Sequence, residues 1–237
     1  MTNPKALIFD VFGTLVDWRS SIAREVGAVA ANKGVEIDAE AFADAWRAEY
    51  DPAMKRIRNG GRGYVSLEIL HAENLDRVLD TFAPDLRMDA AEKANLTDAW
   101  ERLDPWPDVV DGLKQLKSNV IIAPCSNGSI ALMTRLAKYG ALPWDCILGA
   151  EIAQDYKPKP DVYLASCNAL RLEPAEVMMV ACHNGDLAAA QEAGLQTGFI
   201  PRPTEHGPKQ SLDLIPTGGW TTIAQDLPDL ARQIFSQ

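Results

Sequence analysis

The sequence has few cysteines and no long apolar run, and each shortage narrows the kinds of protein that it can encode. The four cysteines, at positions 125, 146, 167 and 182, form no C-x-x-C metal or redox pair. Scattered cysteines are typical of reduced thiols, which predicts a cytoplasmic location. No run approaches the roughly 18 apolar residues of a membrane span, and we expect neither a signal peptide nor a membrane partner.

Positive charge is also scarce. The 237 residues include 23 lysines and arginines against 33 aspartates and glutamates, which gives a formal net charge of −10. Nucleic-acid binding needs a basic surface to meet the phosphates, so this balance predicts no nucleic-acid partner. The same negative field means that a small anionic substrate would need local cationic side chains.

Short apolar runs alternate with helical patterns in the second half of the chain. Apolar runs predict buried strands at 6–9, 120–123, 146–148, 177–181 and 197–200. Helical spacing predicts helices at 109–116, 129–139, 160–170, 187–193 and 226–235. This alternation predicts an α/β fold with a doubly wound parallel sheet, a Rossmann-like core. The segment 201–219, rich in proline and glycine, is expected to be a loop.

A block with only helical patterns separates the first strand from this alternating part. Its apolar residues recur at helical spacing within 22–34, 38–50, 65–82 and 89–103. We therefore expect residues 17–100 to form an inserted helical cap domain, and residues 1–16 and 101–237 to form the core domain. A cap of this kind would close over a site and exclude water.

The first predicted strand ends at an aspartate. Asp10 follows 6–9 directly, and ligands of open α/β sheets bind outside the carboxyl ends of the strands. A carboxylate at that point is costly to bury unless it is hydrogen-bonded or used, which makes Asp10 a candidate nucleophile. An aspartate after a strand is also a common turn residue or helix N-cap, so Asp10 alone leaves both interpretations open.

Polar side chains follow the later strands in the same way. Ser126 and Asn127 begin a helix, where they could hold an anionic oxygen, although such turns are common without a site. Lys157, on a proline-stiffened segment, could keep a carboxylate ionised or be merely solvated. Asp186 could orient that lysine, and His183 could be a base near neutral pH or a loop histidine bound by backbone groups.

In order and spacing, DVFGTLVDW, CSNGS, YKPKPDVY and the strand that leads to Asp186 resemble the four motifs of the haloacid dehalogenase superfamily. The resemblance runs from residue 5 to about residue 205, and the combination is far more specific than any single motif. It implies that Asp10 is a nucleophile.

Two positions depart from the magnesium-dependent phosphatases that make up most of that superfamily. Phe12 replaces their general acid, and a phenylalanine cannot protonate a leaving alcohol. Cys182 stands where a metal-binding aspartate would lie, and Mg²⁺ prefers hard oxygen ligands to a thiol. A halide leaves without a proton. The sequence therefore resembles the type II L-2-haloacid dehalogenases, which implies a reaction without metal or other cofactor.

That resemblance also implies a reaction and a set of site residues. The nucleophile would attack C2 of a small anionic (S)-2-haloacid, and water would release an (R)-2-hydroxyacid from the aspartyl ester. The implied catalytic residues are Asp10, Lys157, His183 and Asp186. The implied substrate and halide contacts are Phe12, Thr14, Arg47, Ser126, Asn127, Tyr163 and Asn184. Arg47 follows Trp46 as the family's halide-facing arginine follows a tryptophan, although it could also be an ordinary exposed helix arginine.

Better-known relatives carry a serine and an asparagine where Ala181 and His183 stand. We therefore expect His183 to act instead, either as a general base or as a donor that orients water. The change could alter the size of the pocket, so short acids, including fluoroacetate, are conceivable substrates. A phosphatase for a small phosphate ester stays an alternative. So does a non-catalytic binding protein, although such a protein would be expected to lose Asp10 or Lys157. A homodimer is expected by analogy alone.

Overall fold

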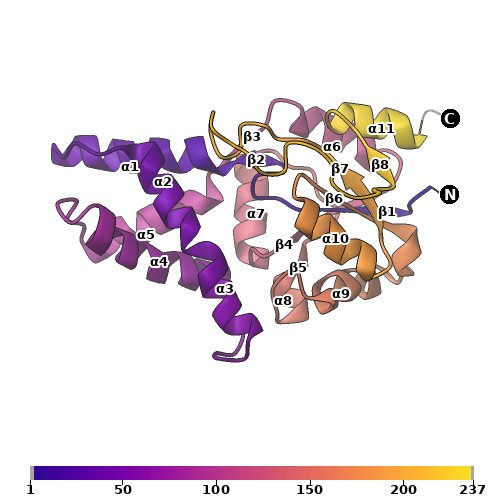
Figure 1. The fold of residues 1–237 in the computed structure, drawn as a ribbon, viewed down its shortest axis with the longest axis horizontal. Coiled ribbons are helices and arrows are strands. Elements are labelled where there is room, and N and C mark those ends of the chain that lie inside the picture. The colour runs from indigo at the N-terminus through magenta and orange to yellow at the C-terminus, as the bar shows by residue number, and fades with distance from the viewer. Residues whose placement is uncertain (1–2, 236–237) are drawn as a thin grey trace.

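The computed structural model describes residues 3–235 and has the expected α/β architecture (Figure 1). Six strands form a parallel sheet in the order β5-β4-β1-β6-β7-β8. Their bounds are β1 Ala6–Phe9, β4 Ile121–Ser126, β5 Leu148–Gly149, β6 Val177–Ala181, β7 Gln196–Phe199 and β8 Thr222–Ile223. Asp10 therefore follows a central strand, at the edge where the carboxyl ends of its neighbours also lie.

The sheet is covered on both faces, as a doubly wound fold requires. Leu7 and Phe9 of β1 pack into one hydrophobic cluster, and Ala6 and Ile8 pack into the other. The first cluster includes residues of α6 (Val109–Lys117) and α11 (Leu227–Phe235), and the second includes residues of α9 (Pro160–Leu170) and α10 (Asn184–Glu192). Side chains that alternate along one strand thus enter two different cores. The predicted fold class is confirmed.

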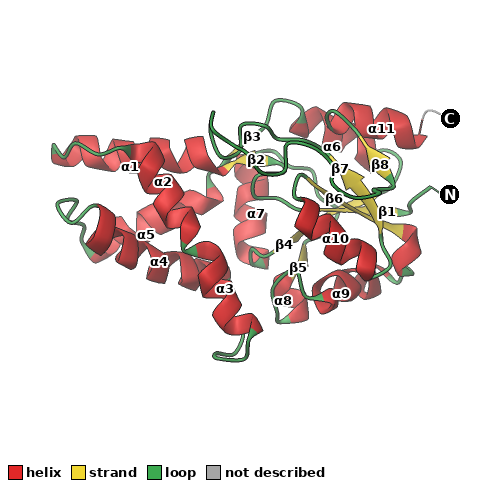
Figure 2. Ribbon diagram, in the orientation of Figure 1, coloured by secondary structure: helices red, strands yellow, loops and turns green. Residues whose placement is uncertain are grey.

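The helical block lies beside the sheet, at the left of Figures 1 and 2. It contains α1 Trp18–Lys33, α2 Ala39–Ala48, α3 Tyr50–Arg58, α4 Leu67–Phe82, α5 Ala90–Thr97 and η1 Asp98–Glu101. The chain enters and leaves it through two short antiparallel strands, β2 (Val16–Asp17) and β3 (Asp104–Pro105). This arrangement is that of an inserted helical cap. The proposed boundaries at 16/17 and 100/101 stay predictions, and residues 1–2 and 236–237 of the predicted core lie outside the described range.

Local signals account for where several helices begin and end. Asp38 accepts a hydrogen bond from the backbone N–H of Ala41 at 3.0 Å, so it is the N-cap of α2. Gly34 ends α1 at a φ of 66°, a left-handed conformation that suits glycine. Ser129 caps α7 (Ile130–Tyr139) through the N–H of Leu132.

Several short elements differ from the predictions. The pattern over 38–50 predicts one helix, but the chain bends at Glu49 and continues as α3, whose buried side chains are Ala53, Met54 and Ile57. The elements β8, α8 (Ala150–Ala153) and η2 (Pro174–Glu176) are too short to show a period in sequence. The predicted strand at 146–148 begins instead at Leu148. Across residues 3–235, no helix combines the length and the apolar character needed to cross a bilayer.

Helices α6 and α11 pack so closely that only a residue without a side chain fits at their contact. A Cβ on Gly112 would lie 2.3 Å from the Cβ of Leu227, whereas a Cβ on Gly27 in α1 would lie 3.6 Å from that of Ala39. We expect Gly112→Ala to lower the free energy of unfolding by roughly 1–3 kcal/mol through overpacking. The matched change Gly27→Ala should raise it by about 0.5–1 kcal/mol through helix propensity. Urea titration of both variants checks this, and equal effects would contradict the packing argument.

Candidate active site

A cavity of about 320 Å³ lies where the carboxyl ends of the strands face the helical cap. Its wall combines core residues, among them Asp10, Phe12, Asn127, Lys157, His183 and Asp186, with the cap residues Arg47, Tyr50 and Asp51. Tyr50 and Asp51 begin α3, the helix that the sequence pattern did not predict. The polar side chains expected at four separate strand ends therefore meet at one place.

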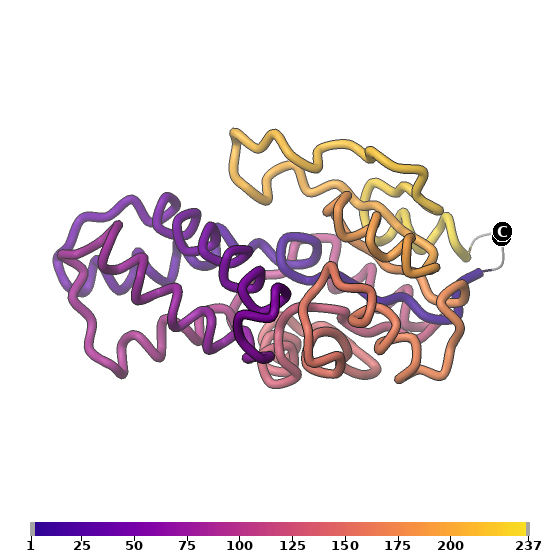
Figure 3. Tube along the Cα trace, turned by 60° about the horizontal axis from the view of Figure 1, so that its bottom comes forward, coloured from indigo at the N-terminus to yellow at the C-terminus, as the bar shows by residue number. Residues whose placement is uncertain are grey.

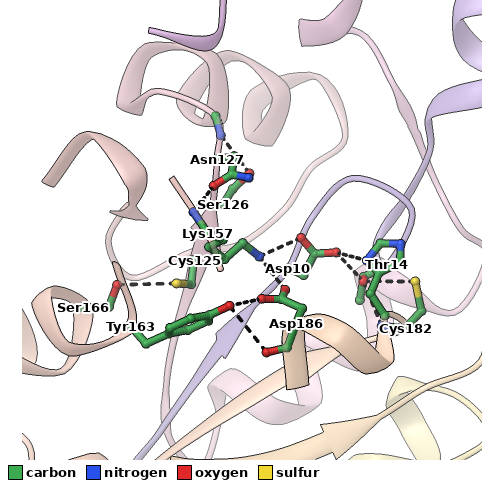
Figure 4. Close-up of polar contacts among 12 residues, drawn as sticks. Asp10, Thr14, Cys125, Ser126, Asn127, Lys157, Tyr163, Ser166, Cys182 and Asp186 are labelled. Atoms are coloured by element: carbon green, nitrogen blue, oxygen red, sulfur yellow. Dashed lines mark hydrogen bonds and ion pairs between the residues drawn. The ribbon is translucent and has the colours of Figure 1, made fainter. Parts of the chain in front are cut away.

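Asp10 is buried in this wall and surrounded by hydrogen-bond donors (Figure 4). Lys157 Nζ donates to Oδ1 at 2.9 Å, and Thr14 Oγ1 donates to Oδ2 at 2.7 Å. His183 Nδ1 lies 3.0 Å from Oδ2. Burial alone would raise the pKa of Asp10, but Lys157, His183 and Thr14 together hold that pKa well below its usual range. The carboxylate is therefore ionised and available as a nucleophile.

Lys157 bridges two carboxylates. Its Nζ also donates to Asp186 Oδ2 at 2.6 Å, and the hydroxyl of Tyr163 donates to the other oxygen of Asp186. Burial disfavours the ammonium, but Asp10 and Asp186 raise the pKa of Lys157 above its usual range. Tyr163 lies behind Asp186 and outside the cavity wall, so it orients that carboxylate. This corrects the expectation that Tyr163 contacts substrate.

His183 bridges a second pair of carboxylates. Its Nε2 lies 3.1 and 3.0 Å from the two oxygens of Glu205. Burial disfavours the imidazolium, but Cys182, Glu205 and Asp10 raise the pKa of His183 well above its usual value. Burial also raises the pKa of the Cys182 thiol to about 11, so that thiol is neutral near pH 7. The carboxylates of Glu205 and Asp10 therefore stabilise the positive charge of the imidazolium. A doubly protonated ring cannot accept a proton. Of the two predicted roles for His183, this state favours the donor over the general base.

Glu205 is the main residue that sequence reasoning missed. It lies in the predicted loop 201–219, is 1% exposed, and also accepts a hydrogen bond from Trp18 Nε1 at 3.1 Å. Figure 3 shows this loop reaching from the core towards the start of α1. Because the loop follows β7, the strand-end rule applied to that strand would have pointed to it.

A glycine makes room for the Glu205 carboxylate. Gly13 has a φ of 88°, and a Cβ there would lie 2.0 Å from Glu205 Oε1. Position 13 therefore needs glycine for two reasons, the left-handed backbone and the space beside it.

Two other predicted residues serve the structure around the cavity. Asn127 Oδ1 accepts from the backbone N–H of Lys157 at 2.8 Å, and its amide nitrogen lies 3.2 Å from Met54 Sδ, so this side chain stays at the cavity wall. Ser126 is fully buried and its hydroxyl accepts from the N–H of Gly128 at 3.1 Å. Ser126 therefore shapes the turn after β4, and its predicted contact with substrate stays a prediction.

Asn184 points away from the cavity. Its Nδ2 donates to Asp213 Oδ1 at 2.8 Å, and its Oδ1 accepts from Thr217 N at 2.8 Å and Trp220 Nε1 at 3.0 Å. These bonds attach the segment 213–220 to the start of α10. The prediction that Asn184 binds substrate is corrected accordingly, because its side-chain amide is engaged by a segment that returns to the start of α10 from beyond β7.

The cap contributes a cation with unused hydrogen-bonding capacity. The guanidinium carbon of Arg47 lies 3.9 Å from the centroid of the Tyr50 ring and 5.5 Å from that of Trp18. Its buried Nη1 has no hydrogen-bond partner among residues 3–235. Phe12 completes this side of the cavity, and buried His71 packs edge-on behind it with a centroid distance of 6.4 Å. Arg47 and Phe12 thus offer a cationic and apolar wall to an anion.

The donor set does not suit the Mg²⁺ ion that many proteins of this fold use. Asp10 and Asp186 supply hard oxygen atoms, but Lys157 Nζ lies between them at hydrogen-bond distance from both. The ammonium already provides the positive charge that a metal would bring, and Cys182 supplies sulfur at the neighbouring position.

A second candidate for a metal centre is the group Cys182, His183 and Glu205, whose ligand atoms lie within 4.8 Å of one another. A neutral thiol and a protonated imidazole are poor metal ligands, because binding requires the thiolate and the free ring nitrogen. The hydrogen bonds from His183 to Glu205 satisfy this group without an ion.

Comparison with known proteins identifies the family. A family model described as haloacid dehalogenase-like hydrolase matches residues 4–194. The chain belongs to this family. The superfamily predicted from the four motifs is therefore confirmed.

The most similar relatives share one kind of name. An (S)-2-haloacid dehalogenase 4A of Burkholderia cepacia is 30% identical over 204 residues, which cover 84% of this chain and 83% of the relative. The crystal structure of a defluorinating L-2-haloacid dehalogenase is 50% identical, with a TM-score of 0.94 over 98% of this chain and 95% of that one. Another L-2-haloacid dehalogenase structure is 44% identical, with a TM-score of 0.95 over 99% and 100% of the two chains.

The charge on His183 should appear in the pH dependence of stability. Its pKa is higher in the folded protein than in the unfolded chain, so its stabilising contribution is fully present below about pH 6.5 and is lost as the pH rises through the folded-state pKa. The stability difference between wild type and His183→Asn should therefore shrink from pH 6 to pH 9 in urea titrations. His206→Asn, which changes a more exposed histidine, is the control. A difference that stays constant with pH would contradict a charged His183.

Proposed function

We propose that the protein is a hydrolytic dehalogenase that converts (S)-2-haloacids into (R)-2-hydroxyacids through an ester on Asp10, without a metal ion. The observation that carries this proposal is a buried, ionised Asp10 beside a cavity in which Phe12 occupies the position of a proton donor. The names of the most similar relatives support the same substrate class.

The first step is displacement of halide. Asp10 Oδ1 attacks C2 from the side opposite the halogen, so the C–O bond forms as the C–halogen bond breaks and the configuration inverts. The cations of the site, Arg47 and Lys157, attract the substrate carboxylate and the departing halide against the negative field of the whole protein. Arg47 takes the halide, because its Nη1 is buried and not engaged by another described side chain.

The second step is hydrolysis of the ester. Asp186, at the cavity wall, takes a proton from water as the water oxygen adds to Cγ of Asp10. Lys157 Nζ, which contacts Oδ1, protonates the departing hydroxyacid oxygen. The proton on Asp186 then returns to Lys157 across their 2.6 Å hydrogen bond, and the new Asp10 carboxyl group loses its proton to solvent. The balance is one halide and one proton released for each water consumed.

The phosphatase alternative has less support. The alcohol of a phosphate ester leaves as an alkoxide, which must be protonated, and Phe12 cannot supply the proton. Cys182 offers sulfur where such a phosphatase would need a carboxylate to hold Mg²⁺. A cytoplasmic location and a homodimer stay predictions.

A direct test is halide release in EDTA. We expect the wild type to release chloride from (S)-2-chloropropionate, with little release from the (R) enantiomer, and activity should persist in EDTA because both proposed steps use side chains alone. Fluoroacetate, assayed with a fluoride electrode, tests whether the cavity accepts the shortest acids. Asp10→Asn, which lacks an anionic nucleophile, should release none.

Two outcomes of this assay would contradict the proposal. The first is an absence of halide from all of these acids with a folded wild-type protein. The second is a phosphatase activity that appears with Mg²⁺ and disappears in EDTA. Either result would return the phosphatase alternative to first place.

The halide-binding role of Arg47 can be tested with a charge series. Arg47→Met removes a cation that faces the departing anion, so single-turnover halide release should slow by about 10²–10³-fold, the usual effect of losing one such donor. Arg47→Lys keeps the charge but not the planar donor. Its rate of halide release should lie between those of wild type and Arg47→Met. Arg87→Met, on an exposed cap position, is the control. A rate for Arg47→Met within threefold of wild type would rule out this role.

A further inference from the structure

The two oxygens of Asp10 lie in different environments. Within the described chain, Oδ1 accepts from Lys157 Nζ, whereas Oδ2 accepts from Thr14 Oγ1 and faces His183 Nδ1. The Thr14 oxygen itself accepts from the backbone N–H of Cys182 at 3.0 Å. The Thr14 hydroxyl lies 2.7 Å from Oδ2 and 3.3 Å from Cys182 Sγ, and it donates to Oδ2 because an ionised carboxylate oxygen is the stronger acceptor. One oxygen thus faces the group that can protonate a leaving group, and the other has two donors.

We propose that His183 and Thr14 form an oxyanion site for hydrolysis of the Asp10 ester, with Glu205 as the positioning residue that keeps His183 charged and aimed at Oδ2. This inference rests on the proposed function, because it needs the ester. It assigns Oδ1 as the nucleophile and Oδ2 as the atom on which negative charge develops.

The step follows from that assignment. Water adds to Cγ, the C–Oδ2 π electrons move onto Oδ2, and a tetrahedral intermediate forms. His183 Nδ1–H and Thr14 Oγ1–H, at 3.0 and 2.7 Å from Oδ2, stabilise the new anion. The anion then re-forms the C=O bond and expels the hydroxyacid oxygen, which is protonated by Lys157. His183 keeps both of its protons throughout, so it acts as a fixed charged donor and not as a base.

Glu205 becomes important when the ester forms. Esterification removes the negative charge of Asp10, so each flanking cation loses one of its two carboxylate partners. Lys157 keeps Asp186, and His183 keeps Glu205, whose oxygens lie 3.0 and 3.1 Å from Nε2. Without Glu205, the imidazolium would be buried beside a neutral ester and would tend to lose its proton.

Other charged or titratable groups lie around His183 and Glu205. Asp10 and Glu205 face the ring directly, and the neighbouring Cys182 is a neutral thiol. His206 Nε2 lies 3.6 Å from Glu205 Oε1, and Arg47 adds positive charge from the cap side and lowers the pKa of Glu205. Burial raises the pKa of Glu205, but His183 itself, with a smaller contribution from Arg47, holds that pKa below its usual value. His183 is left dependent on a single non-reacting carboxylate.

The experiment separates the two chemical steps. Enzyme is mixed with excess (S)-2-chloropropionate, and halide and hydroxyacid are followed from milliseconds over pH 6 to 10. Glu205→Gln should keep a burst of one halide per site but slow ester hydrolysis by about 10²-fold, the scale of one oxyanion donor. The alkaline limit of hydrolysis should move to lower pH, because an amide does not hold an imidazolium. Glu25→Gln, which breaks a 2.7 Å ion pair between α1 and Arg102, should change neither step.

A second variant keeps the test decisive if Glu205→Gln folds poorly. The substitution His183→Asn can place a neutral donor near Oδ2. The shorter side chain cannot reach Glu205, and it carries no charge. His183→Asn should therefore accumulate the ester, seen as a mass increase on the peptide that contains Asp10, and its hydrolysis rate should lose the alkaline limit.

Ester hydrolysis at the wild-type rate with an unchanged pH profile, in either folded variant, would overturn the inference. A folded wild type that releases no halide at all would instead refute the proposed function, so the two failures are distinguishable.

Discussion

A buried carboxylate held between two cations is the interaction on which the site depends. Asp10 contacts Lys157 and His183, and each of these contacts a second carboxylate, Asp186 or Glu205. Removing one member of such a network leaves an unpaired buried charge, which typically destabilises a protein by about 3–5 kcal/mol. The members follow the carboxyl ends of β1, β5, β6 and β7, since Asp10 comes directly after β1, Lys157 lies beyond β5 and α8, and Glu205 lies in the loop after β7. The sheet order therefore determines which charges can meet.

The cap and the core supply different kinds of group to the cavity. In the core, the cations Lys157 and His183 are bound to carboxylates, whereas the cap brings Arg47, stacked on Tyr50 and with a free Nη1. The cap also contacts the segment that carries the lysine, since Arg58 donates to the carbonyl oxygen of Lys157 at 3.0 Å. The position of the cap and the surroundings of Asp10 are therefore linked through one short segment. A movement of the cap would change both the exclusion of water and the alignment of the charges around Asp10.

Residues at strand ends were predictable from the sequence, and residues that depend on side-chain direction were not. Asp10, Lys157 and Asp186 follow buried runs or stiff segments. The rule that ligands bind outside the carboxyl ends of parallel strands therefore predicts that these residues lie close together. Asn184 and Tyr163 occupy the same regions, yet their side chains turn away from the cavity, which no periodicity reveals. The loop of Glu205 has no periodic pattern, so neither its approach to His183 nor the charge that results could be predicted. The short α3, likewise, depends on a bend at a single residue.

Because Gly13 has no side chain, it leaves space for a residue far along the chain. The carboxylate of Glu205 occupies the volume that any side chain at position 13 would fill. The turn after Asp10 and the loop almost two hundred residues later therefore depend on each other sterically, because the Glu205 side chain fills the space that glycine leaves empty at position 13. Neither position can change size independently. A bulkier residue at 13 would have to be accompanied by a shorter one at 205, and His183 would then lose its second carboxylate through a substitution that never touches it.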